Sequence, residues 1–429
     1  MAGGWTCRER KEDKMKEDKM KVFRVAATLG MLALLCFNTT MAAEARSADA
    51  VQPTSNPWFI QAELTTTGDN LYLGRNLSIS GNTIVTTGGG AVYVYVRKGG
   101  KWTNMTQTAT LTASDGSSLY SAAICGNTIV AGAPTGANES AGTAYVFVEP
   151  PGGWTDATET AKLTASDAAG GDFLGFSVAI AGNTVAVGAF EGDGVGVTYP
   201  VGPGAAYVFV KPSGGWSSMT ETAKFTASDG LNGDDFGYSV AVLGDTVAVG
   251  APDATIDGNQ YEGAVYVFLE TGSGWKSGTE AAKLTASDGR FVSIVGFDVS
   301  ISGKNIATSA NNQVYIFTQP ASGWVSGTQT AELEDPSGYT FVLQSAAICN
   351  KYVLAGDPAA RNHPVVDLYL EPSTGWANEA PAYRFSPPAD NGPNGEFGWS
   401  TSIDGTTLVI GSLNNGGSGG NVIYVYGPT

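Results

Sequence analysis

Residues 234–252 read DDFGYSVAVLGDTVAVGAP, and this stretch decides the fold because its phrase recurs along the chain. Two runs in which valine alternates with smaller residues flank a short break at Leu243-Gly244-Asp245. Alternation with a period of two is typical of β-strands, and Gly and Asp tolerate the positive φ that a tight turn needs. The stretch therefore predicts a β-hairpin that is preceded by Phe-Gly and followed by Gly-Ala-Pro.

The hairpin phrase has six relatives in the rest of the chain. They read LSISGNTIVTTGG, AAICGNTIVAGAP, VAIAGNTVAVGAF, VSISGKNIATSAN, AAICNKYVLAGDP and TSIDGTTLVIGSL. Each copy precedes a third strand such as AVYVFL at 264–269, and in six copies a Trp and a further short strand follow. Four strands repeated in this way are the signature of a β-propeller. We therefore expect an all-β, seven-bladed β-propeller with four-stranded blades.

The phase of the repeat predicts how the ring closes. An outer-type strand, AELTTT at 62–67, precedes the first hairpin, and the chain ends on a third-type strand, NVIYVY at 421–426. The last blade thus lacks an outer strand of its own, which the start of the chain can supply. Pairing the two ends would also remove the free edges of an open sheet array. We expect residues 60–67 to pair with residues 421–427.

The N-terminal 45 residues differ from the rest in composition. A dense mix of charges over residues 8–21 precedes an apolar run from Val25 to Phe37, and small residues follow, with the pattern Ala43-Glu44-Ala45. This order is typical of a secretory signal peptide, and the apolar run is short for a membrane span. Met20 offers an alternative start for such a peptide.

The expected organisation follows from these boundaries. We expect a signal peptide with a possible N-terminal extension over 1–45, a linker over 46–57 and a single propeller over 58–429. The mature protein would then be secreted or at the cell surface, with the periplasm as an alternative. It would keep no integral membrane segment after cleavage, and we expect a monomer.

Charge and composition argue against several classes of function. The 429-residue chain has 40 acidic and 23 basic residues, a formal net charge of -17, which argues against nucleic acid as a partner. His363 is the single histidine, so a site of clustered histidines is excluded, and no phosphate-binding glycine motif is present. Cys125 and Cys349 fall on the inner strands of blades two and six, and we expect two free thiols.

The repeat resembles the FG-GAP repeat. The resemblance rests on Phe236-Gly237 with Gly250-Ala251-Pro252 and on near-copies at 173–190 and 397–413, and it is weaker in blades one, two, five and six. FG-GAP repeats build the seven-bladed propeller at the head of integrin α subunits, and related arrays occur in secreted bacterial proteins. The resemblance implies ligand recognition or adhesion at the cell surface, often with calcium on the propeller. The hairpin turns here are too short for the roughly six to eight oxygen ligands of calcium, so that site does not carry over to the turns.

Acidic residues gather instead in the loops that enter and leave the hairpins. Up-and-down connectivity places both kinds of loop on one face of the ring. In blade four these loops carry Asp229, Asp234, Asp235, Asp253 and Asp257. The sequence favours turn and strand-cap roles for these residues, and a calcium site is the alternative.

Further residues of the same face are candidates for ligand recognition, because loops on a rigid scaffold commonly carry binding residues. These candidates are Asp167, Asp172, Glu191, Asp193, Tyr199, Asp390, Glu396 and Trp399. The tryptophans that follow the third strands predict bracing of the outer edge, with sugar-stacking platforms as the alternative.

Two functional hypotheses from different classes remain. The first is a secreted, non-enzymatic binding or adhesion propeller that recognises an extracellular protein or glycan through its acidic loops, with calcium as a candidate cofactor. The second is a secreted propeller enzyme that acts on carbohydrate through a carboxylate pair, although no spacing singles out a pair. A structural coat component is a weaker third. Near-uniform repeats without a catalytic motif favour the first.

Overall fold

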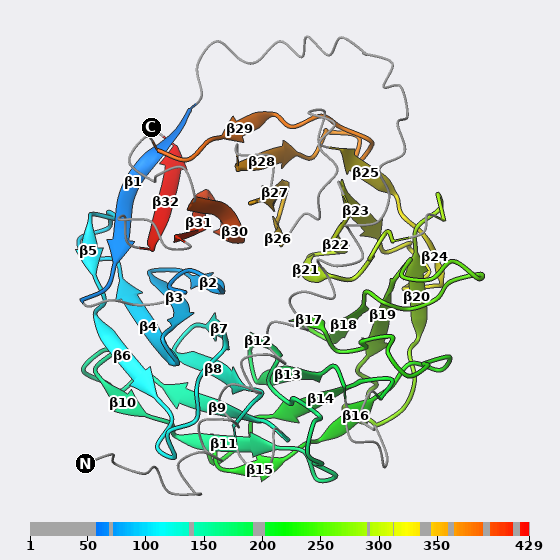
Figure 1. Ribbon diagram of the computed structural model, residues 1–429, viewed down its shortest axis with the longest axis horizontal. Helices are drawn as coiled ribbons and strands as arrows, with labels where there is room; N and C mark the ends of the chain where they lie inside the picture. The colour runs from blue at the N-terminus through cyan, green and yellow to red at the C-terminus, as the bar shows by residue number, and fades with distance from the viewer. Residues whose placement is uncertain are drawn as a thin grey trace, which may run out of the picture. The chain divides into compact units, whose positions relative to one another are not determined.

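Seven β-sheets follow one another around a central axis (Figure 1), which confirms the seven-bladed propeller. The computed structural model describes residues 57–67, 72–136, 141–191, 202–289, 292–311, 313–334, 345–358, 364–388, 395–414 and 421–428. The expected signal peptide lies outside the described residues, and so does all but the last residue of the expected linker. No helix among the described residues is long and apolar enough to cross a membrane.

Each blade runs from an inner strand at the axis to an outer strand at the rim. The inner strands are β2 (Leu77–Ser80), β7 (Ser121–Cys125), β12 (Ser177–Ala181), β17 (Ser239–Leu243), β21 (Asp298–Ser302), β26 (Ser345–Cys349) and β30 (Gly395–Asp404). The second strands are β3 (Thr83–Gly88), β8 (Thr128–Ala133), β13 (Thr184–Ala189), β18 (Thr246–Ala251), β22 (Asn305–Ala310), β27 (Tyr352–Asp357) and β31 (Thr407–Asn414).

The outer half of each blade holds the aromatic strands. The third strands are β4 (Ala91–Val96), β9 (Thr143–Val148), β14 (Ala205–Val210), β19 (Ala264–Leu269), β23 (Gln313–Thr318), β28 (Val365–Leu370) and β32 (Val422–Pro428). The outer strands are β6 (Ala109–Thr112), β11 (Ala161–Thr164), β16 (Ala223–Phe225), β20 (Ala282–Thr285), β25 (Ala331–Glu334), β29 (Tyr383–Phe385) and β1 (Trp58–Thr65).

The opening stretch forms the predicted hairpin. β17 pairs with β18 in antiparallel register from Ser239↔Gly250 to Leu243↔Thr246. Gly244 in the turn has a φ of 59°, a conformation that glycine adopts without strain. Every residue of β18 is buried, because the blade packs between two neighbours.

The two glycine motifs of the repeat meet between neighbouring blades. A Cβ on Gly250 would lie 2.0 Å from the carbonyl oxygen of Gly296, which is the equivalent of Gly237 in the next blade. In the same way, a Cβ on Gly188 would lie 1.9 Å from the carbonyl oxygen of Gly237. Ser239 adds a hydrogen bond by donating from Oγ to the Gly296 oxygen at 2.7 Å. The phrase thus recurs because the contact between blades needs it.

The ring closes through the two ends of the described chain, as predicted. β1 pairs antiparallel with β32, from Trp58↔Pro428 to Leu64↔Ile423. In Figure 1 the blue N-terminal strand lies beside the red C-terminal strand in one sheet. The first strand therefore serves as the outer strand of the seventh blade.

The expectation of four strands in every blade needs one correction. Four of the seven sheets have a fifth strand, contributed by the linker of the following blade. These short strands pair in parallel with the preceding outer strand, and they are β5 (Met105–Thr106), β10 (Ala157–Thr158), β15 (Met219–Thr220) and β24 (Gly327–Thr328). Two residues are too few to show a strand period in the sequence.

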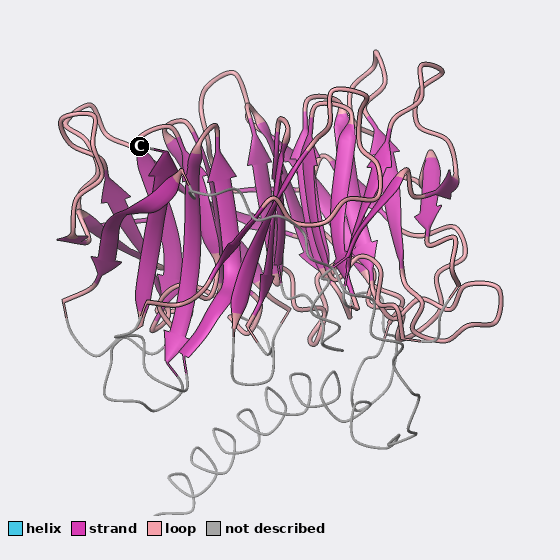
Figure 2. Cartoon of the chain, turned by 90° about the horizontal axis from the view of Figure 1, so that it is seen from above, coloured by secondary structure: helices cyan, strands magenta, loops and turns pink. Residues whose placement is uncertain are grey.

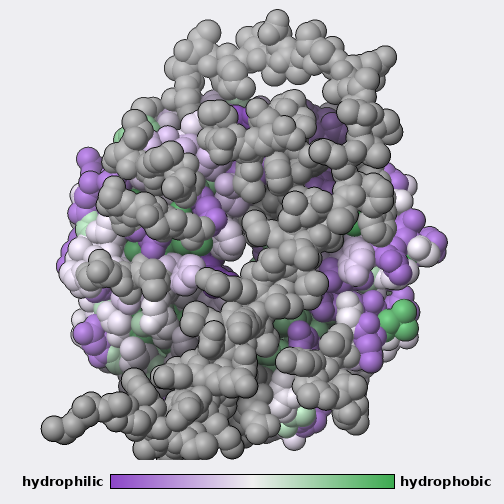
Figure 3. All heavy atoms as spheres, in the orientation of Figure 1, coloured by the Kyte–Doolittle hydropathy of each residue, from purple (hydrophilic) through white to green (hydrophobic). Residues whose placement is uncertain are grey.

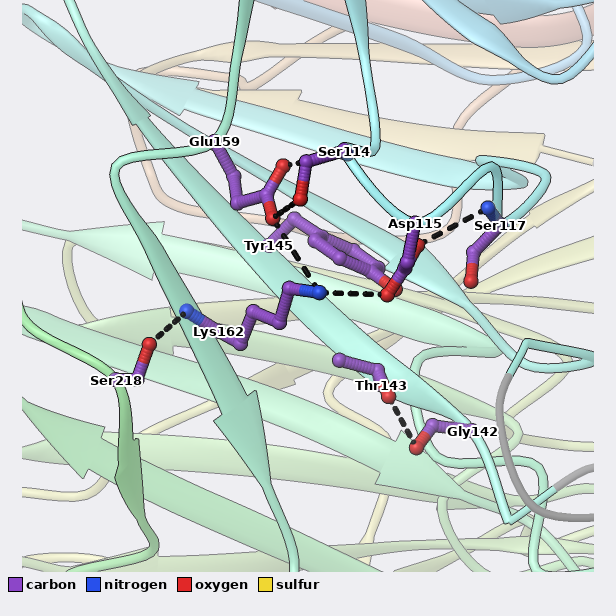
Figure 4. Close-up of polar contacts among 9 residues, drawn as sticks. All are labelled: Ser114, Asp115, Ser117, Gly142, Thr143, Tyr145, Glu159, Lys162 and Ser218. Carbon is purple, nitrogen blue, oxygen red and sulfur yellow. Dashed lines mark hydrogen bonds and ion pairs between the residues drawn. The ribbon is translucent and has the colours of Figure 1, made fainter.

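Side chains also join neighbouring blades at the rim. Asp115, which follows β6, accepts hydrogen bonds from Lys162 Nζ at 2.7 Å and Tyr145 Oη at 2.9 Å in the next blade (Figure 4). Ser114 donates from its backbone nitrogen and Oγ to Glu159, at 2.8 and 2.6 Å. Burial raises the pKa of Asp115, but the hydrogen bonds from Lys162, Ser117 and Tyr145 outweigh it, and the net pKa falls.

The tryptophans and cysteines take the packing roles favoured by the sequence. All six linker tryptophans are buried, so none is a sugar-stacking platform; they are Trp102, Trp154, Trp216, Trp275, Trp324 and Trp376. Cys125 and Cys349 are both free thiols.

Candidate functional site at the mouth of the channel

The strands run between two faces of the ring, which Figure 2 shows from the side. We call the face with the loops that enter and leave the hairpins the loop face, and the face with the hairpin turns the turn face. Inner strands of all seven blades surround a central cavity of about 270 Å³. Figure 3 shows an opening at the centre of the ring.

A belt of aromatic side chains lies at the loop-face end of four inner strands. Tyr120, Phe176, Tyr238 and Phe297 each directly precede the inner strand of blades two to five. The ring centroids of successive members lie 5.3, 4.9 and 5.0 Å apart. All four side chains are only partly buried. We call these four residues the aromatic belt.

Blades one and seven carry Arg75 and Trp399 at the same repeat position. The Arg75 guanidinium carbon lies 4.3 Å from the Tyr120 ring centroid, and its Nη2 donates to Tyr120 Oη at 2.7 Å. A cation thus covers one end of the belt through a cation–π contact. Trp399, a candidate from the sequence, is partly buried at its blade's position in this ring.

Phe190 packs against two members of the belt, Phe176 and Tyr238. It stands where other copies of the repeat have the proline of Gly-Ala-Pro. Its ring centroid lies 4.5 Å from that of Phe176, 5.5 Å from that of Phe173 and 6.1 Å from that of Tyr238. The belt is therefore part of a larger aromatic cluster in blades two to five.

Carboxylates adjoin the belt. Burial raises the pKa of Asp235 well above its ordinary value, and the charges of Asp253, Glu191 and Asp234 raise it further. Burial, with the charge of Asp234, raises the pKa of Asp253 to about 6, and burial alone raises that of Glu191 to about 7. Burial also raises the pKa of Tyr238, with contributions from Tyr120, Asp235 and Asp253. The carboxylates therefore influence one another's pKa values, and Asp235 and Asp253 also raise the pKa of Tyr238 in the belt.

The other aspartates of the calcium hypothesis have separate roles. Asp229 accepts hydrogen bonds from Lys283 Nζ at 2.5 Å and Tyr266 Oη at 3.0 Å. Asp234 is buried and accepts from the Leu231 backbone nitrogen at 2.8 Å, as a turn residue does. Asp257 has a φ of 50°, which is typical of a turn. Among the described residues, no three His, Cys, Asp or Glu side chains are grouped so that they could hold a metal ion.

The remaining candidates divide into three groups. Asp167 repeats the rim contact, accepting from Lys224 Nζ at 2.6 Å and Tyr207 Oη at 3.0 Å. Asp172 is buried and accepts from the Ala169 backbone nitrogen at 2.7 Å, and Glu396 is partly buried on β30. Asp193, Tyr199, Asp390 and also His363 lie outside the described residues.

The aromatic belt was missed by the sequence reasoning, which singled out only Trp399 at this position. The signal was present in blades two to five, because the residue before SAAIC at 121–125, SVAIA, SVAVL and DVSIS is aromatic, whereas Gln344 precedes the second SAAIC at 345–349. An aromatic residue beside a strand is ordinarily a core residue, so the pattern alone does not indicate a site. Partial exposure distinguishes these four from the core aromatics.

Comparison with known proteins supports the repeat assignment. A family model described as the FG-GAP repeat matches residues 105–147, 157–209 and 219–268, from the outer strand of blade one to the third strand of blade four. No curated protein matches the chain. The matched segments hold Gly188, Gly237 and Gly250, whose contacts join neighbouring blades, and the remaining blades repeat the same four strands around the ring. Three segments of the chain between residues 105 and 268 therefore match the FG-GAP repeat, within a protein folded as a seven-bladed β-propeller.

Proposed function

We propose that this protein is a secreted, non-enzymatic binding propeller that recognises an extracellular protein or glycan at the loop-face mouth of its channel. The observation that carries the proposal is the aromatic belt with Arg75 at one end and carboxylates beside it. Partly exposed aromatic rings with a polar surround are common at recognition sites, where they supply contact area at a low entropic cost.

The fold itself does not account for the belt. Blade contacts use the glycine before the belt position and the serine after it, as Gly237 and Ser239 show in blade four. The belt position lies between them and accepts residues as different as Arg75, Tyr238 and Trp399. A position at which the scaffold does not fix the residue type, and which nevertheless holds four aromatic rings in succession, is suited to binding.

A binding comparison tests this function. Wild-type mature protein and the double variant Phe176→Ala/Tyr238→Ala are applied to a glycan array and to a pull-down from extracellular material. The control is Phe59→Ala, since Phe59 is 45% exposed on β1 at the rim, away from the channel. We expect the belt variant to bind its ligand at least about tenfold more weakly and the control to bind normally. Unchanged binding by a folded belt variant would contradict the proposal.

A second candidate function rests on one observation, the raised pKa of Glu191. A carboxyl group with a pKa of about 7 can act as a general acid near neutral pH, and glycoside hydrolysis needs one protonated and one ionised carboxyl group. Asp253, with a pKa of about 6, would be the ionised partner, since the charges of Glu191 and Asp253 both act on Asp235. Release of reducing ends from a polysaccharide, lost in Glu191→Gln, would favour this candidate over the binding propeller.

A further inference from the structure

The turn face differs from the loop face in charge. Its basic residues are Arg97, Lys98, Lys101, Lys211, Lys276, Lys304 and Lys351. Its acidic residues are Glu149, Asp156, Asp245, Glu270, Glu371 and Asp404. These residues lie in the hairpin turns and in the linkers after the third strands, and the same linkers also hold Glu159, Glu221, Glu280 and Glu379. The turn face thus has basic as well as acidic residues, and an anionic ligand can bind only where the basic side chains gather.

An open cavity of about 630 Å³ lies on the turn face between the hairpin turns of blades five, six and seven. Lys304 and Lys351 line it, together with Asn305, Asn350, Tyr352 and Glu371. A space of this size is typical of sites for small ligands.

The two lysines stand at a turn position that holds other residue types elsewhere. Blades one to four carry Asn82, Asn127, Asn183 and Asp245 there, and blade seven carries Thr406. The backbone role of the position is constant, because its carbonyl oxygen accepts a hydrogen bond from the residue after the third strand in blades one to six. Lys304 accepts from Gln319 and Lys351 from Glu371 in this way, at 2.7 and 2.8 Å. The fold therefore requires neither ammonium group.

Both ammonium groups are available to a ligand. Lys304 and Lys351 are exposed, and neither forms an ion pair within the part of the chain that the structure describes. The lysines of the outer strands differ, since Lys224 and Lys283 pair with aspartates at 2.6 and 2.5 Å. Lys351 Nζ lies 5.4 Å from the ring centroid of Tyr352, which lines the same cavity. Two cations without an ion pair, from neighbouring blades at one cavity, are suited to charge-assisted hydrogen bonds with an anion.

The neutral and acidic groups that line the cavity further restrict the chemical class of ligand that it can bind. Asn305 Oδ1 accepts from Thr318 Oγ1 at 2.7 Å, which leaves its amide NH₂ as a donor to the cavity. Glu371 places a carboxylate in the same lining. A carboxylate repels a bare anion but accepts hydrogen bonds from hydroxyl groups. The lining thus combines cations with groups that bind hydroxyls.

We propose that this cavity binds an acidic sugar, with its carboxylate or sulfate group at Lys304 and Lys351 and its ring hydroxyls at Asn305 and Glu371. The site lies on the face opposite the aromatic belt and does not depend on the function proposed for the belt. One propeller would then have a separate binding site on each of its two faces.

Calorimetric titration at low salt tests the site. The probes are tetragalacturonate, a sulfated tetrasaccharide, uncharged cellotetraose and inorganic phosphate. The variants are Lys304→Gln/Lys351→Gln and, as a matched control on the same face, Lys98→Gln/Lys101→Gln. We expect one or both acidic tetrasaccharides to bind the wild type, to bind the first variant at least about tenfold more weakly, and to bind the control normally. The probe that binds shows whether carboxylate or sulfate is the preferred group.

Three outcomes would overturn the proposal. The first is that neither acidic tetrasaccharide binds the wild type. The second is that the Lys304→Gln/Lys351→Gln and Lys98→Gln/Lys101→Gln variants bind the acidic sugars with equal affinity. The third is that cellotetraose or phosphate alone binds as tightly as the acidic sugars. The variant Glu371→Gln tests the hydroxyl contact: it should weaken the acidic sugars, whereas a site for bare anions would gain affinity. Because Phe176→Ala/Tyr238→Ala leaves this cavity intact, failure here and failure of the belt proposal are distinguishable.

Discussion

Gly250 shows how one residue can carry a contact between blades. Its ideal Cβ lies 2.0 Å from the Gly296 oxygen and 2.4 Å from Ser239 Oγ, distances that no side chain tolerates. Gly278, in contrast, has nothing within 4 Å of its ideal Cβ and has no positive φ. The two glycines therefore differ in what an added methyl group would do.

Gly250→Ala should destabilise the propeller by about 1–3 kcal/mol, because the methyl group must push blade five away from blade four. Thermal unfolding followed by circular dichroism measures the loss, with Gly278→Ala as the control that unfolds like the wild type. Equal melting temperatures for Gly250→Ala and the wild type would show that the blades move apart without cost.

The loop aspartates predict the response to calcium. Asp229 already accepts from Lys283 and Tyr266, and Asp234 accepts from a backbone nitrogen. We therefore expect the melting temperature to be unchanged between excess chelator and millimolar calcium, since a ligand stabilises only the state that binds it. A rise that disappears in Asp253→Asn would instead establish a calcium site in blade four.

At the scale of elements, β1 determines whether the ring is closed. It covers the edge of β32 through backbone pairing from Trp58 to Leu64, and its Ala62 and Leu64 are fully buried. Without it, β32 would present an exposed strand edge to solvent and to other chains.

Deletion of residues 1–65 should therefore destabilise the whole ring and promote self-association, whereas a chain that begins at residue 46 should unfold like the full-length chain. Thermal unfolding and size-exclusion chromatography measure the two effects. A monomeric deletion variant with an unchanged melting temperature would show that β1 contributes nothing to closure.

For the whole molecule, two groups of carboxylates give stability opposite dependences on pH. Burial raises the pKa values of Asp253 and Asp298 to about 6, and that of Glu191 to about 7. The folded state therefore binds more protons than the unfolded state between about pH 4 and pH 7, and stability falls as the pH rises through this window. The rim aspartates Asp115 and Asp167 have lowered pKa values, so their contribution is lost as the pH falls below about 4.

The melting temperature should thus be higher at pH 5 than at pH 8. In the wild type, the Ala346 backbone nitrogen donates a hydrogen bond to the Asp298 carboxylate at 2.8 Å. The variant Asp298→Asn keeps an oxygen that can accept this bond but does not titrate, so it should reduce the difference in melting temperature between pH 5 and pH 8. Scanning calorimetry across this range measures both. A melting temperature that is higher at pH 8 in the wild type would contradict the assignment.

The sequence by itself determined the parts of the fold that repeat. Strand period, turn residues and the number of copies depend on local chemistry, so the seven hairpins and the closure by β1 could be predicted. The short linker strands were missed, because two residues carry no period.

Only the tertiary structure decided which polar and aromatic residues meet. Asp167 and Asp229, expected on the ligand face, bind lysines 57 and 54 residues away in the next blade. The aromatic belt and the Lys304–Lys351 cavity likewise join residues from neighbouring blades. A repeat pattern states what each blade contains, but contacts between blades depend on how the ring places them in space.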